Sequence, residues 1–182
     1  MTHTAQSQNR AHDIDPKIYV ACLASYNSGI LHGQWIDATQ SADDMRAEIA
    51  KMLARSPISD AEEYAIHDYE GFEGITLCEY SGIDRVAEIA EFLSEHGQLG
   101  AAVASYFGDD IDEARSALDD RYHGSYESLS DFAQSITEET TSIPKNLAFY
   151  IDWDKMARDM EMSGDVLSIE TAHDEVHVFW GS

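Results

Sequence analysis

The sequence has few basic residues. Eleven lysines and arginines stand against 35 aspartates and glutamates, so the formal net charge is −24. A protein that binds nucleic acid directly needs a basic patch, and anionic membrane surfaces also attract basic proteins. The charge therefore excludes nucleic-acid binding through such a patch, argues against a membrane partner, and favours a partner with a basic surface.

Cysteine and long apolar runs are also scarce. The two cysteines, Cys22 and Cys78, lie far apart and form no C-x-x-C pair, so neither a disulfide framework nor a zinc ribbon is indicated. This usage fits a reducing cytoplasm. No apolar run approaches the roughly 18 residues of a membrane span, and the start MTHTAQSQNRAHDID lacks the apolar core of a signal peptide. We expect a cytoplasmic protein with a disordered tail at residues 1–16.

Large aliphatic residues and phenylalanine are scarce as well, with 37 of 182 positions being Leu, Ile, Val or Phe. Such a composition with a high net charge lies near the limit at which chains stop folding. Periodic segments indicate that this chain folds, but around thin cores. We predict an elongated α+β protein of three small lobes: an α+β lobe at 17–74, a helical lobe at 75–124 and an α+β lobe at 125–182.

Apolar periodicity and turn residues predict the elements of these lobes. Ser41 is the expected N-cap of a helix that stops before Pro57. Strands are predicted at 17–24, 33–37, 62–70, 146–152, 165–170 and 175–180. Helices are predicted at 41–56, 82–97, 99–108, 109–122, 129–139 and 153–164.

The stretch HDYEGFEG, residues 67–74, places three carboxylates among aromatic residues and glycines. The nearest basic residues are Arg55 before it and Arg85 after it. Pairing with bases close in sequence therefore does not explain Asp68, Glu70 and Glu73.

Acidic residues dominate a wider window around this stretch. Between Asp60 and Glu113 there are fifteen acids and one base, which gives a net charge of −14 in 54 residues. Four of these acids follow i, i+4, i+7, i+11 spacing on one predicted helix: Asp84, Glu88, Glu91 and Glu95. Like charges at i, i+4 destabilise an isolated helix by about 0.2 to 0.5 kcal/mol per pair. The alternatives are an acidic surface that only confers solubility and an array of carboxylates that imitates phosphates.

We take the second interpretation and predict a surface that mimics DNA and binds a protein partner. One stripe is sparser than the phosphates of a duplex, which carries a charge about every 1.7 Å of its axis, so several segments must share the task. The predicted surface consists of Asp60, Glu62, Glu63, Asp68, Glu70, Glu73, Glu79, Asp84, Glu88, Glu91, Glu95, Asp109, Asp110, Asp112, Glu113, Asp119 and Asp120.

Motifs for catalysis or metal binding are weak. HDEVH, residues 173–177, resembles a zinc-protease motif but lies in a predicted strand, where the two histidines would be about 13 Å apart. DDIDE, residues 109–113, lacks the glycine of a calcium loop and is better explained as an acidic helix N-terminus. No G-x-S-x-G or phosphate-binding loop is present. We predict no catalytic residue, no metal and no cofactor.

Three blocks of the sequence resemble one family. IYVACLASYNSGILHGQWIDA (18–38), DYEGF (68–72) and IPKNLAFYIDWDKMARDM (143–160) are similar, in order and spacing, to the ArdA antirestriction proteins of plasmids and conjugative transposons. The resemblance implies an elongated three-domain monomer, a homodimer and a surface that mimics bent B-form DNA. It also implies binding in the DNA-binding groove of type I restriction-modification enzymes, so that incoming unmodified DNA escapes cleavage.

Two further hypotheses stay open at this point. The chain could be a DNA mimic directed at another DNA-binding protein, such as a nucleoid protein or a repressor, or a metal-dependent hydrolase that uses carboxylates with His173 or His177. For the homodimer, we expect the contact in the last lobe, at Phe149, Trp153 and Met156, because the segments around them are apolar in an otherwise acidic chain.

Overall fold

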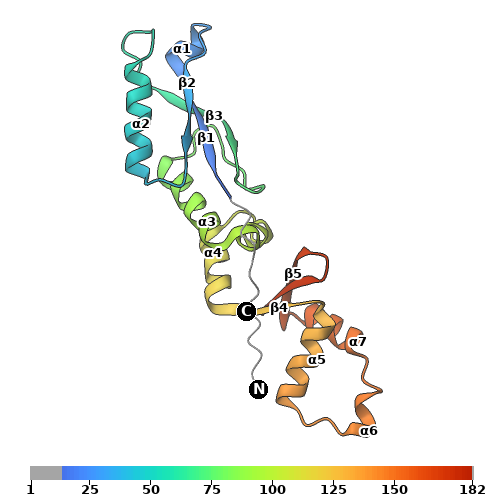
Figure 1. Cartoon of the computed structure of the whole chain (residues 1–182). Helices are drawn as coiled ribbons and strands as arrows, with labels where there is room; N and C mark the ends of the chain where they lie inside the picture. Colours follow the sequence, from blue (N-terminus) through green and yellow to red (C-terminus); the bar gives the residue numbers. More distant parts are fainter. Residues whose placement is uncertain (1–13, 182) are drawn as a thin grey trace. The chain divides into compact units, whose positions relative to one another are not determined.

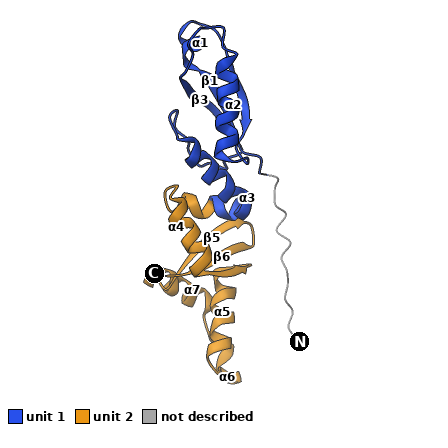
Figure 2. Cartoon of the chain, turned by 90° about the vertical axis from the view of Figure 1, so that its left-hand side faces the viewer, with its two compact units in different colours: residues 1–101 blue, residues 102–182 orange. Residues whose placement is uncertain are grey.

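The computed structural model describes residues 14–181. They form two compact units, one up to Ala101 and one from Ala102 onward, shown in blue and orange in Figure 2. Both units mix helices with a small antiparallel sheet, which confirms the α+β class. The division into three lobes stays a prediction. The predicted tail lies outside the described residues except at its end, where the Pro16 carbonyl already accepts a hydrogen bond from the Ala38 amide at 2.9 Å.

The first unit is built on a three-stranded sheet (Figure 1). Strands β1 (Lys17–Cys22), β2 (Gly33–Asp37) and β3 (Tyr64–Glu70) pair antiparallel in the order β2-β1-β3. The short helix α1 (Leu23–Asn27) stands between β1 and β2. All three strands lie within ranges predicted from the sequence.

Helix α2 (Ala42–Ala54) lies between β2 and β3 in the chain and buries its apolar side. Ser41 caps it by accepting a hydrogen bond from the Asp44 amide at 3.2 Å, as predicted. Met45, Ile49 and Met52, spaced at helical intervals, are buried together with Ile18 and Ile36 of the sheet. This small core fixes one face of the sheet.

Helix α3 (Ile83–Tyr106) begins in the first unit and is interrupted at Gly97. Gly97 has φ 60° and ψ −146°, a conformation that residues with a Cβ rarely adopt, so the predicted helix end at this glycine is confirmed as a break within a longer helix. Val86, Ile89 and Leu93 on the apolar stripe before Gly97 are buried.

The second unit contains a sheet covered by helices. Strands β4 (Tyr122–Tyr126), β6 (Glu175–Trp180) and β5 (Val166–Ala172) pair antiparallel in the order β4-β6-β5. Helices α5 (Leu129–Thr140) and α7 (Trp153–Ser163) pack against each other, and α5 contributes Phe132 to a core with Val166 and Val178. Gly164 ends α7 in the left-handed conformation at φ 80°, as its position predicted.

One prediction in this unit is wrong, and one strand was not predicted. The segment 146–152 is not a strand: helix α6 (Lys145–Ala148) and a turn occupy it, and the amides of Leu147 and Ala148 bond to the carbonyl of Pro144. The predicted helix at 109–122 is present as α4 (Ile111–Ser116) and one π-helical turn, η1 (Ala117–Arg121), but strand β4, which begins at Tyr122, was not predicted. Pairing with β6 explains β4, since YHGSY has little strand character of its own.

Candidate functional site: an acidic surface

The predicted mimic residues are spread over both units and are mostly exposed. Fifteen of the seventeen are exposed, and Glu88 and Asp109 are half-buried. Eleven of them, from Asp60 to Glu95, belong to the first unit and six to the second. Exposure is what a carboxylate needs to meet a partner's base, but it is also the usual state of acidic residues.

The turn after β3 explains how Glu73 in the stretch HDYEGFEG is held at the surface. Phe72 is buried and packs edge-to-face on Tyr69, with ring centroids 5.8 Å apart. Gly71, Glu73 and Gly74 all have positive φ, at 74°, 49° and 92°. The Phe72 ring therefore anchors a tight turn from which the exposed Glu73 projects.

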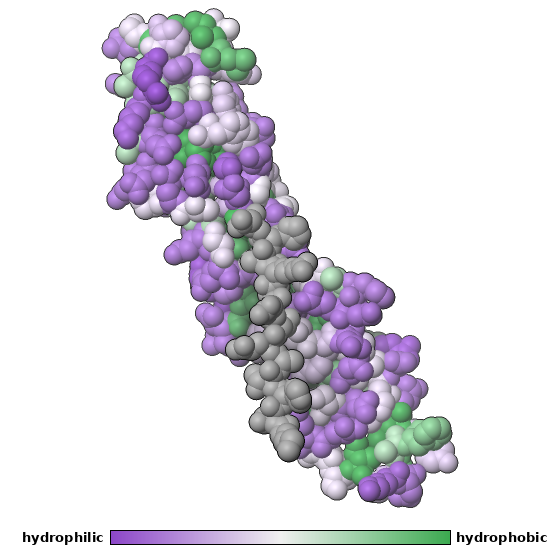
Figure 3. Space-filling model, in the orientation of Figure 1, coloured by the Kyte–Doolittle hydropathy of each residue, from purple (hydrophilic) through white to green (hydrophobic). Residues whose placement is uncertain are grey.

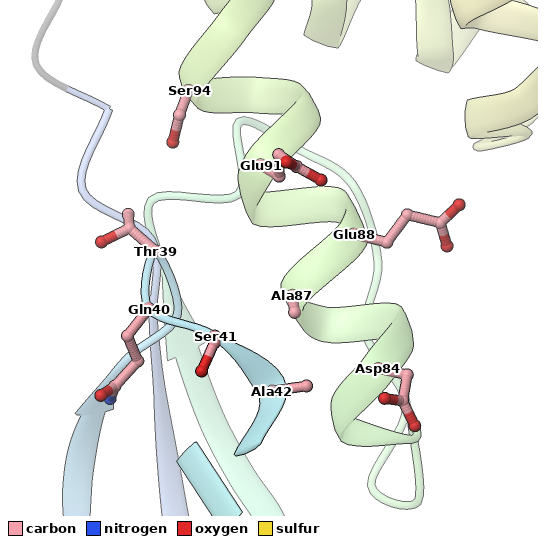
Figure 4. A pocket seen from close by; sticks show the side chains of 9 residues that line it. All are labelled: Thr39, Gln40, Ser41, Ala42, Asp84, Ala87, Glu88, Glu91 and Ser94. Carbon is pink, nitrogen blue, oxygen red and sulfur yellow. The ribbon is translucent and has the colours of Figure 1, made fainter. Parts of the chain in front are cut away.

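The acidic stripe of α3 lines a shallow groove. Figure 4 shows Asp84, Glu88 and Glu91 on the helix beside the segment Thr39–Ala42, which leads into α2. The groove has a volume of about 580 Å³, and Ser94 lines it as well. It combines carboxylates with hydroxyl and amide groups.

Two acids of the stripe are paired with arginines. Arg46 of α2 contacts both Asp43, at 3.0 Å, and Asp84. Arg85 contacts Glu88 at 2.8 Å, one turn further along α3. Arg46 lies outside the window from Asp60 to Glu113 in which charges were counted. The stripe in the folded protein is therefore less negative than that count indicates.

In the second unit, part of the acidic cluster has a structural role. Asp110 caps α4 by accepting a hydrogen bond from the Glu113 amide at 3.0 Å, which confirms the interpretation of DDIDE as a helix N-terminus. Glu113 pairs with Arg121 at 2.6 Å, and the Arg121 guanidinium lies over the Phe107 ring at 5.3 Å.

The sequence reasoning missed further exposed acids of the second unit, because it followed the densest run of acids and stopped at Asp120. Their exposure follows from the charge of the side chains, so a count over the whole chain would have found them. They are Glu127, Asp131, Glu138, Glu139, Asp152, Asp154, Asp159, Glu161, Asp165, Glu170 and Asp174.

The two histidines of HDEVH lie in different environments. His173 is exposed in the turn between β5 and β6, whereas His177 is 6% exposed on β6. The Tyr122 hydroxyl lies 2.9 Å from Nδ1 of His177, and the Thr171 hydroxyl lies 3.0 Å from its Nε2. Across residues 14–181, no group of three or more His, Cys, Asp or Glu side chains is placed to hold a metal ion.

An apolar area lies at the predicted dimer contact. Phe149 is 90% exposed and Tyr150 80%, and both follow α6. Trp153 and Met156, on α7, are half-buried. The Thr137 hydroxyl of α5 donates a hydrogen bond to the sulfur of Met156 at 3.4 Å. In Figure 3, hydrophilic residues in purple cover most of the visible face, and a green area marks the region of α6 and the segment after it.

No helix within residues 14–181 has the length and apolar character needed to cross a membrane.

A comparison with protein families identifies the family of the chain. The model of the antirestriction protein ArdA family matches residues 18–175. This chain belongs to the ArdA family. A comparison with curated proteins gave no match. The match covers nearly the whole described chain, and all three blocks quoted from the sequence lie within it.

Membership of the ArdA family supports an antirestriction function and an interaction with restriction-modification enzymes. The family is described by its effect on restriction and not by a catalysed reaction. The hypothesis of a metal-dependent hydrolase therefore has no support from the family, nor from a cluster of ligands within residues 14–181.

Proposed function

We propose that this ArdA protein acts in the cytoplasm as a homodimer whose carboxylates imitate the phosphates of B-form DNA and occupy the DNA-binding site of type I restriction-modification enzymes. The observation that carries the proposal is the exposure of fifteen of the seventeen predicted carboxylates, in a chain with a net charge of −24. Incoming unmodified DNA would then escape cleavage without any chemical step.

The affinity follows from electrostatics. DNA-binding proteins gain much of their affinity when lysines and arginines neutralise phosphates and release counterions. Carboxylates held on folded elements compete for the same basic groups. They carry no pattern of base edges, so one mimic inhibits enzymes that recognise different sequences.

The direct test is the cleavage of unmodified plasmid by a purified type I restriction enzyme while the protein is titrated in. We expect inhibition near stoichiometric amounts and none from polyglutamate at the same carboxylate concentration. If polyglutamate inhibits equally well, the number of charges matters and their arrangement does not.

A pair of matched variants tests where the charge is needed. The first replaces five exposed acids of the predicted surface with glutamine: Glu62, Glu63, Glu70, Glu73 and Glu79. The second replaces five exposed acids outside it, with glutamine or asparagine: Glu127, Glu138, Glu139, Glu170 and Asp174. Each removes five negative charges, and we expect the first to need at least about tenfold more protein for half-inhibition. Equal losses would contradict a mimic surface at these positions.

The dimer is tested by sedimentation equilibrium. We propose that Phe149, Trp153 and Met156 lie in the dimer contact, because the exposed phenyl ring of Phe149 would be covered there. Phe149→Ser should shift the protein to monomer, whereas Tyr80→Ser, at a site 72% exposed in the first unit, should not. A Phe149→Ser protein that stays dimeric would place the contact elsewhere.

A further inference from the structure

The sheet of the first unit has one face that α2 does not cover. Gln34 of β2 donates to Glu48 of α2 and accepts from Arg55 at the end of that helix, so the face with Gln34 and Ile36 lies under α2. Trp35 alternates with these residues and lies on the opposite face, where it is 44% exposed. This second face is called the open face below.

Strand register places an aromatic pair and an acid in one row across the open face. Tyr19 on the central strand is directly opposite Trp35 on β2 and opposite Asp68 on β3. Side chains directly opposite each other in antiparallel strands lie on the same face with Cβ atoms about 4.5 to 5.5 Å apart. The Tyr19 and Trp35 rings have centroids 5.5 Å apart and planes tilted by 58°.

The next row of the open face adds two acids and one base. Lys17 is opposite Asp37 and Glu70, and its ammonium group contacts Asp15. The face therefore presents three carboxylates, those of Asp37, Asp68 and Glu70, around an exposed tryptophan, and the one lysine among them already has a carboxylate partner.

Two of the groups on this face are held in place. Asp37 accepts hydrogen bonds from the hydroxyl and the amide of Thr39, at 2.7 and 2.8 Å, and these bonds hold its pKa below the usual value, so that it stays ionised. Gly33 leaves room for the Tyr19 ring, because a Cβ at position 33 would lie 2.8 Å from the Tyr19 hydroxyl. The tyrosine can thus lie across β2 beside Trp35.

An aromatic ring beside a carboxylate suits arginine better than lysine. The guanidinium group is planar and weakly hydrated, so it stacks on an aromatic ring while its N–H groups bind a carboxylate. The lysine ammonium is a compact and strongly hydrated charge without a planar face that could stack on the ring. We propose that the open face binds arginine side chains of the partner's DNA-binding surface, with Tyr19 and Trp35 as the stacking pair and Asp68 as the carboxylate partner.

This inference rests on the proposed function for the partner's identity, and it adds a chemical preference that charge alone does not give. The occupant is a protein surface rich in arginine, since the open face offers net negative charge and aromatic surface together. A mimic with such a face would hold an arginine that normally binds a phosphate, and would do so by stacking as well as by charge.

The test uses the full-length protein labelled with ¹⁵N and two probes of equal charge, acetylated hexa-arginine amide and acetylated hexa-lysine amide. We expect the indole N–H signal of Trp35, assigned through Trp35→Leu, to move with hexa-arginine and to move much less with hexa-lysine. Trp35→Leu keeps the net charge and should weaken hexa-arginine binding about two- to fivefold while leaving hexa-lysine binding unchanged. Tyr80→Leu, at an exposed aromatic residue in the loop between β3 and α3, is the matched control and should change neither affinity.

Two results would overturn the inference: equal response of Trp35 to the two peptides, or an equal loss in Trp35→Leu and Tyr80→Leu. If Trp35→Leu fails to fold, the comparison of the two peptides on the unmodified protein decides alone. Plasmid cleavage is measured in parallel and separates the two proposals. A protein that does not inhibit the restriction enzyme but prefers hexa-arginine at Trp35 keeps the binding face and loses the proposed target, whereas an inhibitor without that preference loses only this inference.

Discussion

At the scale of single residues, Gly71 controls the turn that carries Glu73. It has φ 74°, and a Cβ at this position would lie 2.5 Å from the Asp15 carbonyl oxygen. Both the backbone conformation and the space exclude a side chain.

Replacing Gly71 with alanine is therefore expected to lower the free energy of unfolding by at least about 2 kcal/mol. Gly74→Ala, three residues on, is the control: Gly74 has φ 92° but no heavy atom within 4 Å of the added Cβ, so the loss there should be about 1 kcal/mol. Urea unfolding measures both. Equal losses would mean that the approach of Asp15 does not constrain the turn.

His177 gives the second unit a dependence on pH. Burial lowers the pKa of His177, and the nearby Glu175 partly opposes this effect. A pKa below the unfolded value of about 6.5 means that the folded state favours neutral histidine. Its contribution to stability is complete above that value and is lost as the pH falls through the folded pKa. The Tyr122 hydroxyl and the Thr171 hydroxyl face the same ring.

We expect the melting temperature of the unmodified protein to fall below pH 6.5 more steeply than that of His177→Gln. His173→Gln, at a side chain that is 93% exposed, should follow the unmodified protein. The measurement is thermal unfolding followed by circular dichroism between pH 5 and 8. Parallel curves for all three proteins would show that burial of His177 does not affect the stability in this range.

The exposure of the predicted acidic residues could be predicted from sequence, but their contacts with other side chains could not. Exposure follows from the cost of burying a charge, which depends little on the fold. The contact between Arg46 and Asp84 joins residues 38 positions apart, so only the folded chain brings them together. The pairing of Tyr19 with Trp35 and Asp68 likewise depends on strand register, including an irregularity in the β1–β3 pairing after Tyr19.

At the scale of elements, the helices and strands that could be predicted are those with caps, apolar stripes or end signals in their own sequence. Helix α2 has a capping serine and an apolar stripe, and α7 ends at a glycine, so both appeared as expected. The segment 146–152 has strand-forming residues, but Phe149 and Tyr150 are exposed. The backbone hydrogen bonds described for this segment connect residues three or four positions apart, and none pairs it with a strand. Strand β4 was not predicted because its own residues favour a strand only weakly. It forms by pairing with β6, which lies about fifty residues further along the chain.

The contact between α2 and α3 is expected to be weak but measurable. Arg46→Gln should lower the free energy of unfolding only slightly, since the side chains are exposed and solvent screens them. Lys51→Gln in the same helix removes the same charge and is the control. In a double-mutant cycle with Asp84→Asn, a coupling energy that vanishes in 1 M salt is expected. No coupling at low salt would mean that the ion pair does not join the two helices.

At the scale of the whole molecule, the charge of −24 opposes folding. Like charges repel within the compact state, and salt screens this repulsion over about 10 Å at 0.1 M. The same salt weakens a complex that depends on charge.

Salt should therefore act in opposite directions on folding and on binding. We predict that raising NaCl from 20 to 200 mM raises the melting temperature while it weakens inhibition of the restriction enzyme. The variant with five neutralised acids of the predicted surface, from Glu62 to Glu79, should show a smaller rise in melting temperature. A melting temperature that is indifferent to salt would argue against clustering of the acids.

The left-handed residues of the chain set a limit on how it can be engineered. In the described part of the chain, the residues other than glycine with positive φ are Asp60, Glu73, Asp109 and Asp174, and each of them is acidic. Glycine suits that backbone conformation better, so a design method that scores heat resistance alone would favour replacing these four acids. Every such replacement removes a negative charge, three of them from the predicted mimic surface. A thermostable inhibitor of restriction must therefore be selected for both properties at once, because at these positions they conflict.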